Sequence, residues 1–375
     1  MDTFLFCPNT ACQLHEEGRG PTWYASRGSY HTKAFGTVRR YRCNCCGHWF
    51  SQQSFSIDYY AKRKINYPEL LLRHASSSSG RAISRTMGIS PDSVQNRLDR
   101  LARQALGIHA ALLPLIRTQE AVCVDGFVSF DVSQYFSSEV TISITSDSRF
   151  VLDLSQANRR RSGTMTAGQK KRACQLYAQS SLEHGGISRT FREILDSLSI
   201  IWPRTAYAPL VITTDEKPDY VRILDRHPLF RSQNEEHRVI HQAINSHLPR
   251  TFSNPLFASN YLDREIRKDL ANHHRGTACF SRNVANGLCR LAAYLCHHNY
   301  FKRFCINAPC VDNTLHGEAA GIPRAAIEKE LSSFFSERYF LSRVKLLPTL
   351  ERIWAKKSPT PRKKNPDYVP AYALL

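Results

Sequence analysis

A short apolar run that ends in a carboxylate constrains the fold more than any other stretch of the sequence. In residues 210–215, Leu-Val-Ile-Thr-Thr-Asp, apolar and β-branched residues lead directly to Asp215, and a polar stretch with Pro218 follows. This pattern is typical of a buried parallel strand that ends at the rim of a sheet, where α/β proteins bind their ligands. Because Asp is also a common helix cap after a strand, a functional role for Asp215 needs support from elsewhere in the chain.

The composition favours a multidomain protein that binds nucleic acid. A chain of 375 residues is long enough for several domains of about 100–200 residues, and a hydrophobic fraction of 42% argues against disorder. The net charge of +19 indicates a polyanionic partner, for which nucleic acid is the first candidate. We find no signal peptide and no apolar run of the roughly 20 residues that a membrane span needs. We therefore expect an intracellular protein without a membrane partner, whose 12 cysteines are metal ligands or buried thiols.

Two cysteine pairs near the N-terminus predict a zinc ribbon over residues 1–55. One pair encloses four residues and the other encloses two, and each lies in a turn-like setting; the pairs are Cys7 with Cys12 and Cys43 with Cys46. Two such knuckles, joined by short strands, bring four thiolates to one structural, tetrahedral zinc ion. Zinc would stabilise a segment that is too small to fold on its own core. The spacing leaves other ligands open, namely Cys45 in place of Cys43, and His15 or His48.

Residues 56–115 have the pattern of a helix-turn-helix domain. A helix over 81–87, a turn at Gly88, and a second helix that begins with a Ser90 cap and Pro91 follow a serine-rich break. The apolar residues that would fill the angle between these helices are Ile83, Met87, Ile89, Val94 and Leu98. The residues predicted to face outward, toward a DNA groove, are Ser93, Gln95, Asn96, Arg97 and Arg100. An ordinary helical hairpin is the alternative, and the basic outer face together with the neighbouring ribbon favours DNA.

Three β-rich runs over 121–127, 140–145 and 149–154 predict an antiparallel meander whose first strand carries Asp125. Two basic clusters follow at once; they contain Arg159, Arg160 and Arg161, and then Lys170 and Lys171. A charge run is by default solvated surface, but beside a strand-borne carboxylate it is also suited to contact a phosphate backbone.

The order of the expected elements predicts an α/β fold of the ribonuclease-H-like class, a mixed sheet with flanking helices. Helices over about 168–198 and 220–225 enclose the 210–215 strand, and a further short strand at 237–241 gives the order β-β-β-α-β-α-β-α. In that fold the first and fourth strands are neighbours. Asp125 and Asp215 would then converge.

A third carboxylate is expected on a charged helix over residues 257–274, whose buried stripe is Leu262, Ile266 and Leu270. This helix carries Asp263, Glu265 and Asp269 among basic residues, so a solvated helix surface of mixed charge is the alternative. Three carboxylates at a sheet edge can hold two divalent ions roughly 3.5–4 Å apart for in-line displacement at a phosphodiester. Oxygen ligands favour Mg²⁺ or Mn²⁺.

With these motifs in place, the sequence resembles bacterial insertion-sequence transposases of the DDE type, in the group that joins an N-terminal zinc-binding helix-turn-helix region to a ribonuclease-H-like catalytic domain. The resemblance extends over about residues 1–305, and its most specific stretches are 124–127, 211–215, and 263–270 leading into 277–282. It implies that Asp125 and Asp215 are the first two catalytic carboxylates. At the position where the family has its Glu the chain has Asn260, with Arg267 seven residues on. Glu265 is our nominal third carboxylate, with Asp263 as the alternative.

The resemblance implies a domain order and a set of partners. We expect a zinc ribbon over 1–55, a helix-turn-helix domain over 56–115, a DDE catalytic domain over 116–305, and a helical C-terminal region over 306–375 that ends in a flexible basic tail. The partners would be the terminal inverted repeats and target DNA, bound by a homo-oligomer in the bacterial cytoplasm, at the nucleoid. Two other functions fit the same residues: a DNA-binding regulator or domesticated transposase without catalysis, and a ribonuclease-H-like nuclease or resolvase.

Overall fold

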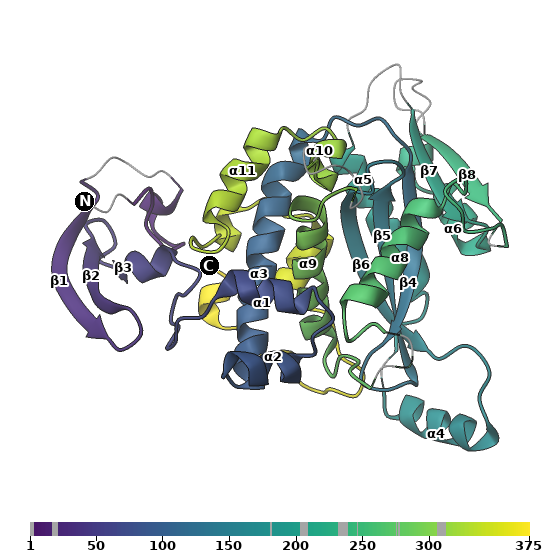
Figure 1. The fold of residues 1–375 in the computed structure, drawn as a ribbon, viewed down its shortest axis with the longest axis horizontal. Coiled ribbons are helices and arrows are strands. Elements are labelled where there is room, and N and C mark those ends of the chain that lie inside the picture. Colours follow the sequence, from purple (N-terminus) through teal and green to yellow (C-terminus); the bar gives the residue numbers. More distant parts are fainter. Residues whose placement is uncertain are drawn as a thin grey trace.

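The computed structural model of the chain describes residues 4–16, 22–180, 182–202, 209–231, 239–245, 247–274, 276, 278–305 and 313–375. It is a mixed α/β structure with a small N-terminal sheet, a layer of long helices, and a mixed five-stranded sheet with flanking helices (Figure 1). The α/β class is therefore confirmed.

The N-terminal sheet has three antiparallel strands, β1 (Tyr24–Thr32), β2 (Gly36–Cys43) and β3 (Trp49–Ser51), in the order β1-β2-β3. Its own small core consists of three cysteines and three aromatic residues, Cys7, Cys12, Trp23, Tyr41, Cys43 and Phe50. This sheet is joined to the rest of the protein through the segment around Phe340, whose ring lies 5.0 Å from that of Phe6 and 5.7 Å from that of Phe55. So small a core agrees with the expectation that a bound ion contributes to stability here.

The helical region consists of α1 (Tyr67–His74), α2 (Gly80–Met87) and α3 (Pro91–Leu112). The predicted turn is confirmed: Gly88 ends α2 in the left-handed conformation at φ 64°, and the Ser90 side chain caps α3 at the Ser93 amide. Ile83, Val94 and Leu98 are buried between the helices, as expected.

The orientation predicted for α3 is wrong for two of its arginines. Arg97 and Arg100 are only 6% and 7% exposed, because the 57–67 segment and the C-terminal Tyr372 cover this face of the helix. The Arg97 guanidinium donates to the Arg63 carbonyl at 2.8 Å and pairs with Asp58 at 3.3 Å. Arg100 donates to the Ile57 carbonyl at 2.6 Å and to the Tyr372 hydroxyl at 2.9 Å. Both cations are structural. Asn96 is exposed, and Ser93 and Gln95 are half-buried.

The burial of Arg97 leads to a prediction about stability. Arg97→Met should lower the free energy of unfolding by about 3–5 kcal/mol, because it leaves the buried Asp58 carboxylate without its cation. The matched control is Arg85→Met, the same change at an exposed arginine of α2, for which we expect a change within about 0.5 kcal/mol. Chemical denaturation measures both. Equal stability of the two variants would contradict the buried ion pair.

The main sheet has the strand order β6-β5-β4-β7-β8. The first three strands form the predicted antiparallel meander, β4 (Val122–Phe130), β5 (Phe136–Thr145) and β6 (Val151–Arg160). The strands β7 (Leu210–Asp215) and β8 (Val239–Ile244) are parallel to β4. The pairing of β4 with β7 confirms that the first and fourth strands are neighbours. Residues 237 and 238 of the strand expected at 237–241 lie outside the described residues.

Helices cover the two faces of this sheet. The helix α5 (Gly186–Ile201) packs against β5 and β6, and α8 (Phe257–Asp269) packs against β4 and β5. Thr141 of β5 bonds Thr190 of α5, whereas Arg267 of α8 lies over Phe127 of β4. Because Thr141 pairs with Gly126, the residue before Phe127, side-chain alternation places α5 and α8 on opposite faces. Shorter helices flank β7 and precede α5, namely α4 (Ala167–Ala178), α6 (Pro218–Leu224) and α7 (Pro228–Arg231).

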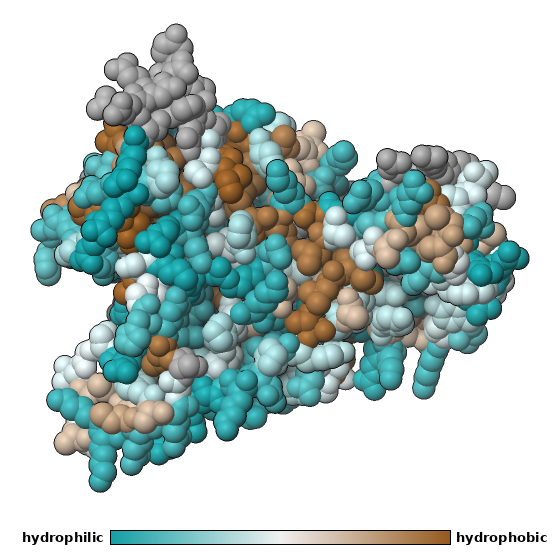
Figure 2. All heavy atoms as spheres, turned by 180° about the vertical axis from the view of Figure 1, so that it is seen from behind, coloured by the Kyte–Doolittle hydropathy of each residue, from teal (hydrophilic) through white to brown (hydrophobic). Residues whose placement is uncertain are grey.

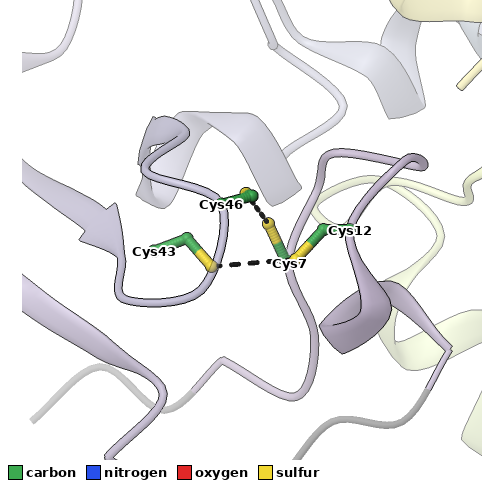
Figure 3. Close-up of side chains that lie close together, drawn as sticks. All are labelled: Cys7, Cys12, Cys43 and Cys46. Atoms are coloured by element: carbon green, nitrogen blue, oxygen red, sulfur yellow. Dashed lines mark hydrogen bonds between the residues drawn. The ribbon is translucent and has the colours of Figure 1, made fainter.

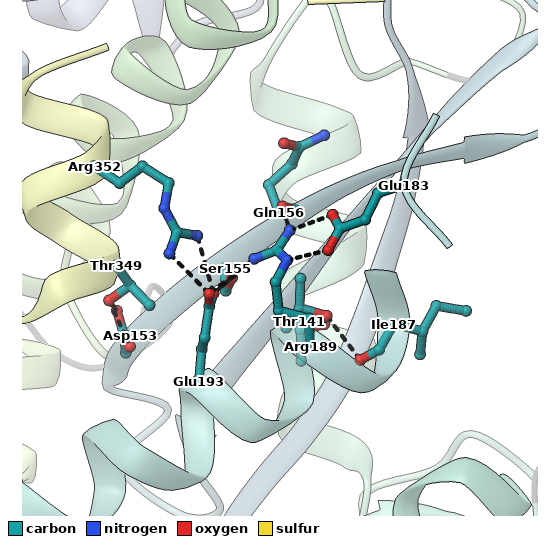
Figure 4. Close-up of polar contacts among 11 residues, drawn as sticks. Thr141, Asp153, Ser155, Gln156, Glu183, Ile187, Arg189, Glu193, Thr349 and Arg352 are labelled. Carbon is teal, nitrogen blue, oxygen red and sulfur yellow. Dashed lines mark hydrogen bonds and ion pairs between the residues drawn. The ribbon is translucent and has the colours of Figure 1, made fainter. Parts of the chain in front are cut away.

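A network of ion pairs holds α5 to the sheet and to the C-terminal region (Figure 4). Glu193 of α5 accepts from both terminal nitrogens of Arg352, at 2.8 and 3.0 Å, and pairs with Arg189 at 2.9 Å. Buried Asp153 of β6 accepts from the Thr349 hydroxyl at 2.7 Å. Ion pairs and hydrogen bonds thus help apolar packing to hold α5 and the C-terminal region on this face of the sheet.

The C-terminal region contains α9 (Val284–Tyr300), α10 (His316–Ala319), α11 (Arg324–Ser333) and α12 (Pro348–Trp354), with α9 packed along α3. The expected flexible tail is wrong, because its residues pack on the body. The Thr360 hydroxyl accepts from the Val284 amide at 3.0 Å, and Asn283 donates to Asp367 at 2.6 Å. Ala373, near the end of the chain, is buried.

One hydrophobic core extends from Ile57 to Trp354 and joins the helical region to the main sheet. Because this core is continuous across residues 115 and 305, it does not mark a domain boundary at either position. The domain boundaries expected there remain a prediction. Among the described residues, no helix is both long enough and apolar enough to cross a membrane.

Candidate acidic site and cysteine cluster

The main sheet brings Asp125 and Asp215 to one place. The strands β4 and β7 pair in parallel only at Val122 with Ile212 and at Cys123 with Thr213. Asp125 and Asp215 each come two residues later, where the pairing of the two strands has ended. The two carboxylates therefore lie at a notch where these two central strands of the sheet separate.

A lysine ammonium lies between these two carboxylates. Lys217 Nζ is 3.2 Å from Asp215 Oδ2 and 3.7 Å from Asp125 Oδ1. It also lies 3.4 Å from the Tyr220 hydroxyl, at the start of α6. Although burial disfavours the ammonium, Tyr220, Asp125 and Asp215 together raise the pKa of Lys217. The sequence interpretation missed this residue, whose signal is its place two residues after a strand-end carboxylate.

Burial also acts on Asp125. It raises the pKa of this carboxyl group, an effect that Lys217 opposes and the nearby Asp215 charge reinforces. Asp125 Oδ1 accepts from the Gly126 amide at 2.7 Å, which directs the carboxylate along the open edge of β4. A cation at the notch is therefore favourable to both aspartates.

A third carboxylate lies close by and was not predicted. Glu139 of β5 is 1% exposed, and burial raises its pKa, an effect that Arg159 and Lys217 oppose and that the charges of Asp125 and Asp215 reinforce. One of its oxygens pairs with Arg159. The other, Oε1, is buried without a hydrogen-bond partner, and so is Asp215 Oδ1. Buried carboxylate oxygens without partners are costly, so this site fits a group that would supply positive charge.

The two α8 carboxylates lie in different surroundings. Glu265 is 5% exposed and pairs with Lys268 at 2.8 Å and with Lys302. These lysines outweigh the effect of burial and lower its pKa. Asp263 is half-buried and lies one turn before Arg267, which donates to the Val128 carbonyl at 2.9 Å. The face shared by Asn260, Asp263 and Arg267 therefore turns toward β4, and Asp263 has the better position of the two.

The four predicted cysteines form a cluster that could bind a metal ion (Figure 3). All four Sγ atoms lie within 4.8 Å of one another. Cys7 and Cys46 are 3.7 Å apart, and Cys12 and Cys43 are 3.9 Å apart. A tetrahedron with metal–sulfur bonds of about 2.3 Å has edges of roughly 3.8 Å. The thiols are thus spaced as a tetrahedral ion requires.

The structure places the alternative ligands Cys45, His15 and His48 outside this cluster. Cys45 is exposed and outside the cluster. The His15 ring is engaged on both nitrogens, with the Cys7 carbonyl and the Ser342 hydroxyl, each at 2.7 Å. The cluster of the described residues therefore consists of Cys7, Cys12, Cys43 and Cys46.

The two basic clusters predicted to contact DNA, at residues 159–161 and 170–171, lie on and beside α4. This helix stands away from the body (Figure 1), and from behind the projection at lower left carries mainly hydrophilic residues (Figure 2). Lys170, Lys171 and Arg160 are exposed. Arg161 is half-buried and bonds Gln134 at 2.7 Å. Arg159 is partly engaged inside the protein, through its pair with Glu139.

A second basic surface lies on the N-terminal sheet and was missed. The Trp49 ring, 49% exposed, lies 4.9 Å from the Arg40 guanidinium and 5.8 Å from that of Arg42. An exposed aromatic ring between two arginines suits contact with nucleic acid. Its sequence signal is the alternation of arginines along β2, opposite a tryptophan on β3.

Comparison with protein-family models found no match to this chain, and comparison with curated proteins also found none.

Proposed function

We propose that the chain is a DNA transposase of the DDE type, which binds element ends and catalyses Mg²⁺-dependent DNA cleavage and strand transfer. The observation that carries the proposal is the convergence of Asp125 and Asp215 around one ammonium group, where β4 and β7 separate. The strand order β6-β5-β4-β7-β8 also agrees with a ribonuclease-H-like fold. The sequence resemblance supports the same assignment.

Asp125 and Asp215 would hold the divalent cations. The unpartnered Asp215 Oδ1 offers one ligand atom, and displacement of Lys217 would free the oxygens that it now contacts. When bound, Mg²⁺ would activate the attacking oxygen and stabilise the leaving oxygen of an in-line displacement. Lys217, held near Tyr220, would then be close enough to the site to neutralise charge on a phosphate.

The cysteine cluster and the basic surfaces would position DNA. We infer that the cluster holds one zinc ion, with no open coordination position for catalysis. DNA would be bound as duplex, through phosphate contacts at α4 and the arginines around Trp49, by a homo-oligomer on paired ends. The N-terminus of α3, with Ser93, Gln95 and Asn96, remains the candidate for base contacts.

The exposed lysines of α4 give a test of DNA binding. Lys170→Gln with Lys171→Gln should weaken binding to all duplexes alike and reduce the salt dependence by roughly one ion for each lysine removed. Lys329→Gln, which removes an exposed lysine from α11, is the control and should bind as wild type does. Titrations at several salt concentrations measure the slope; an unchanged slope in the double variant would remove α4 from the interface.

A regulator without catalysis is the second candidate, and one observation favours it. Asn260 stands where the resemblance expects a Glu, and Glu265 is held by two lysines. In vitro joining of pre-cut element ends to target DNA separates the candidates. A transposase joins the ends with Mg²⁺ or Mn²⁺ and stops when the metal is chelated, a nuclease cuts without joining, and a regulator binds without either reaction.

A further inference from the structure

We propose that Glu139 of β5 is the third carboxylate of the acidic site, and that Asp125, Asp215 and Glu139 together bind the divalent cations. This inference rests on the proposed function. It moves the third ligand from α8, where the sequence resemblance leads one to expect it, to the strand beside Asp125.

The Glu139 side chain extends from β5 toward β4. In the β4–β5 register Glu139 is opposite Val128, on the face that also carries Gly126. A Cβ atom at Gly126 would lie 2.5 Å from Glu139 Oε1 and 3.0 Å from Glu139 Cδ. The carboxylate therefore extends across β4, directly over Gly126, and the missing side chain is what allows this close approach.

Asp125 and Glu139 both lie next to Gly126. The Asp125 Oδ1 atom is bound to the amide of the same Gly126, at 2.7 Å. Asp125 thus reaches the Gly126 backbone along the strand edge, and Glu139 reaches it from the face covered by α5. Side-chain alternation directs Asp125 and Glu139 to opposite faces of the sheet, so the two carboxylates approach Gly126 from different sides, next to the notch that Asp215 also borders.

Two carboxylate oxygens of this site have no hydrogen-bond partner. Glu139 is almost completely buried, and Arg159 engages Oε2 alone. Glu139 Oε1 and Asp215 Oδ1 are both buried without partners. The Lys217 ammonium lies between Asp125 Oδ1 and Asp215 Oδ2, where we expect a metal cation to bind. A single ammonium leaves two of the oxygens unpartnered, whereas divalent cations prefer several oxygen ligands.

Mn²⁺ binding to the full-length protein, measured by calorimetry, tests the assignment. Glu139→Gln should weaken binding by more than about ten-fold, as Asp125→Asn should. Gly126→Ala should also weaken it, because the added methyl group displaces the carboxylate while retaining its charge. The matched control is Asp153→Asn, which changes another buried carboxylate of the same sheet, paired with Thr349, and should leave Mn²⁺ affinity unchanged. Thermal unfolding of each variant confirms that it is folded.

The outcomes separate this inference from the proposed function. Loss of affinity in Asp263→Asn together with wild-type affinity in Glu139→Gln would place the third ligand on α8 and overturn the inference, leaving the proposed site intact. If Asp125→Asn bound Mn²⁺ as tightly as wild type does, the acidic site would not be the cation site, and the proposed function would lose its support.

Discussion

Asp215→Asn and Asp125→Asn should each reduce strand joining by roughly 10³-fold or more, while DNA binding and the melting temperature remain close to those of wild type. The amide keeps the shape of the side chain but removes a negative charge and an anionic ligand atom. Both carboxylates border one notch and contact one ammonium group. We therefore expect the loss of either one to disrupt the same cation site.

The control for this prediction lies four residues beyond Asp215. Asp219, at the start of α6, is 46% exposed at its side chain and pairs with Arg222 at 3.5 Å. Asp219→Asn should join ends at the wild-type rate. A comparable loss in Asp219→Asn, or joining by Asp215→Asn, would show that the effect is not one of metal ligation at the notch.

Cys43→Ser should release the bound ion and unfold the N-terminal sheet. Structural zinc sites contribute about 10–16 kcal/mol of binding free energy, and the core of this sheet contains only a few buried residues besides the cysteines. We expect zinc content to fall from one ion per chain to none, and limited proteolysis to cut within residues 22–51. The melting temperature of the remaining core should change little.

Cys45→Ser is the matched variant, because Cys45 is two residues away, exposed and outside the cluster. It should retain one zinc ion and resist proteolysis as wild type does. Loss of metal from Cys45→Ser, or full zinc occupancy in Cys43→Ser, would show that the four thiols identified here are not the ligand set.

Local patterns in the sequence were sufficient to predict the parts of the fold that depend on local chemistry. The run that ends in Asp215 predicted a strand, and the order of elements predicted that this strand lies beside the one that carries Asp125. The two cysteine pairs predicted the cluster, and Ser90 with Pro91 predicted the start of α3. The strand, each cysteine pair and the start of α3 are determined by residues close together in the chain, whereas the pairing of β4 with β7 was predicted from the order of the elements.

The failures arose where residues far apart in sequence decide the environment. Arg100 looks like a surface residue on a helix wheel, but Tyr372, far along the chain, covers it. The lysine- and proline-rich tail looks too polar to pack, yet its Thr360 and Asp367 satisfy the start of α9. Burial of this kind depends on tertiary contacts that helical periodicity does not report.

Glu139 was missed for a related reason. Its strand alternates polar and apolar residues, which is typical of a sheet with one solvated face, but all ten residues of β5 are buried. A charged residue on such a strand is expected at the surface until α5 is seen to cover that face. The usable signal was Gly126, whose place beside Asp125 leaves room for a neighbouring side chain.

The most direct test of the central claim is a crystal structure of the protein soaked in MnCl₂, with anomalous scattering recorded for manganese. We predict a manganese peak within bonding distance of Asp125 and Asp215, with the Lys217 ammonium displaced from its position between them. The peak should be lost in Asp215→Asn. A structure in which Lys217 still contacts both aspartates, with no manganese at the notch, would contradict the assignment of a catalytic cation site.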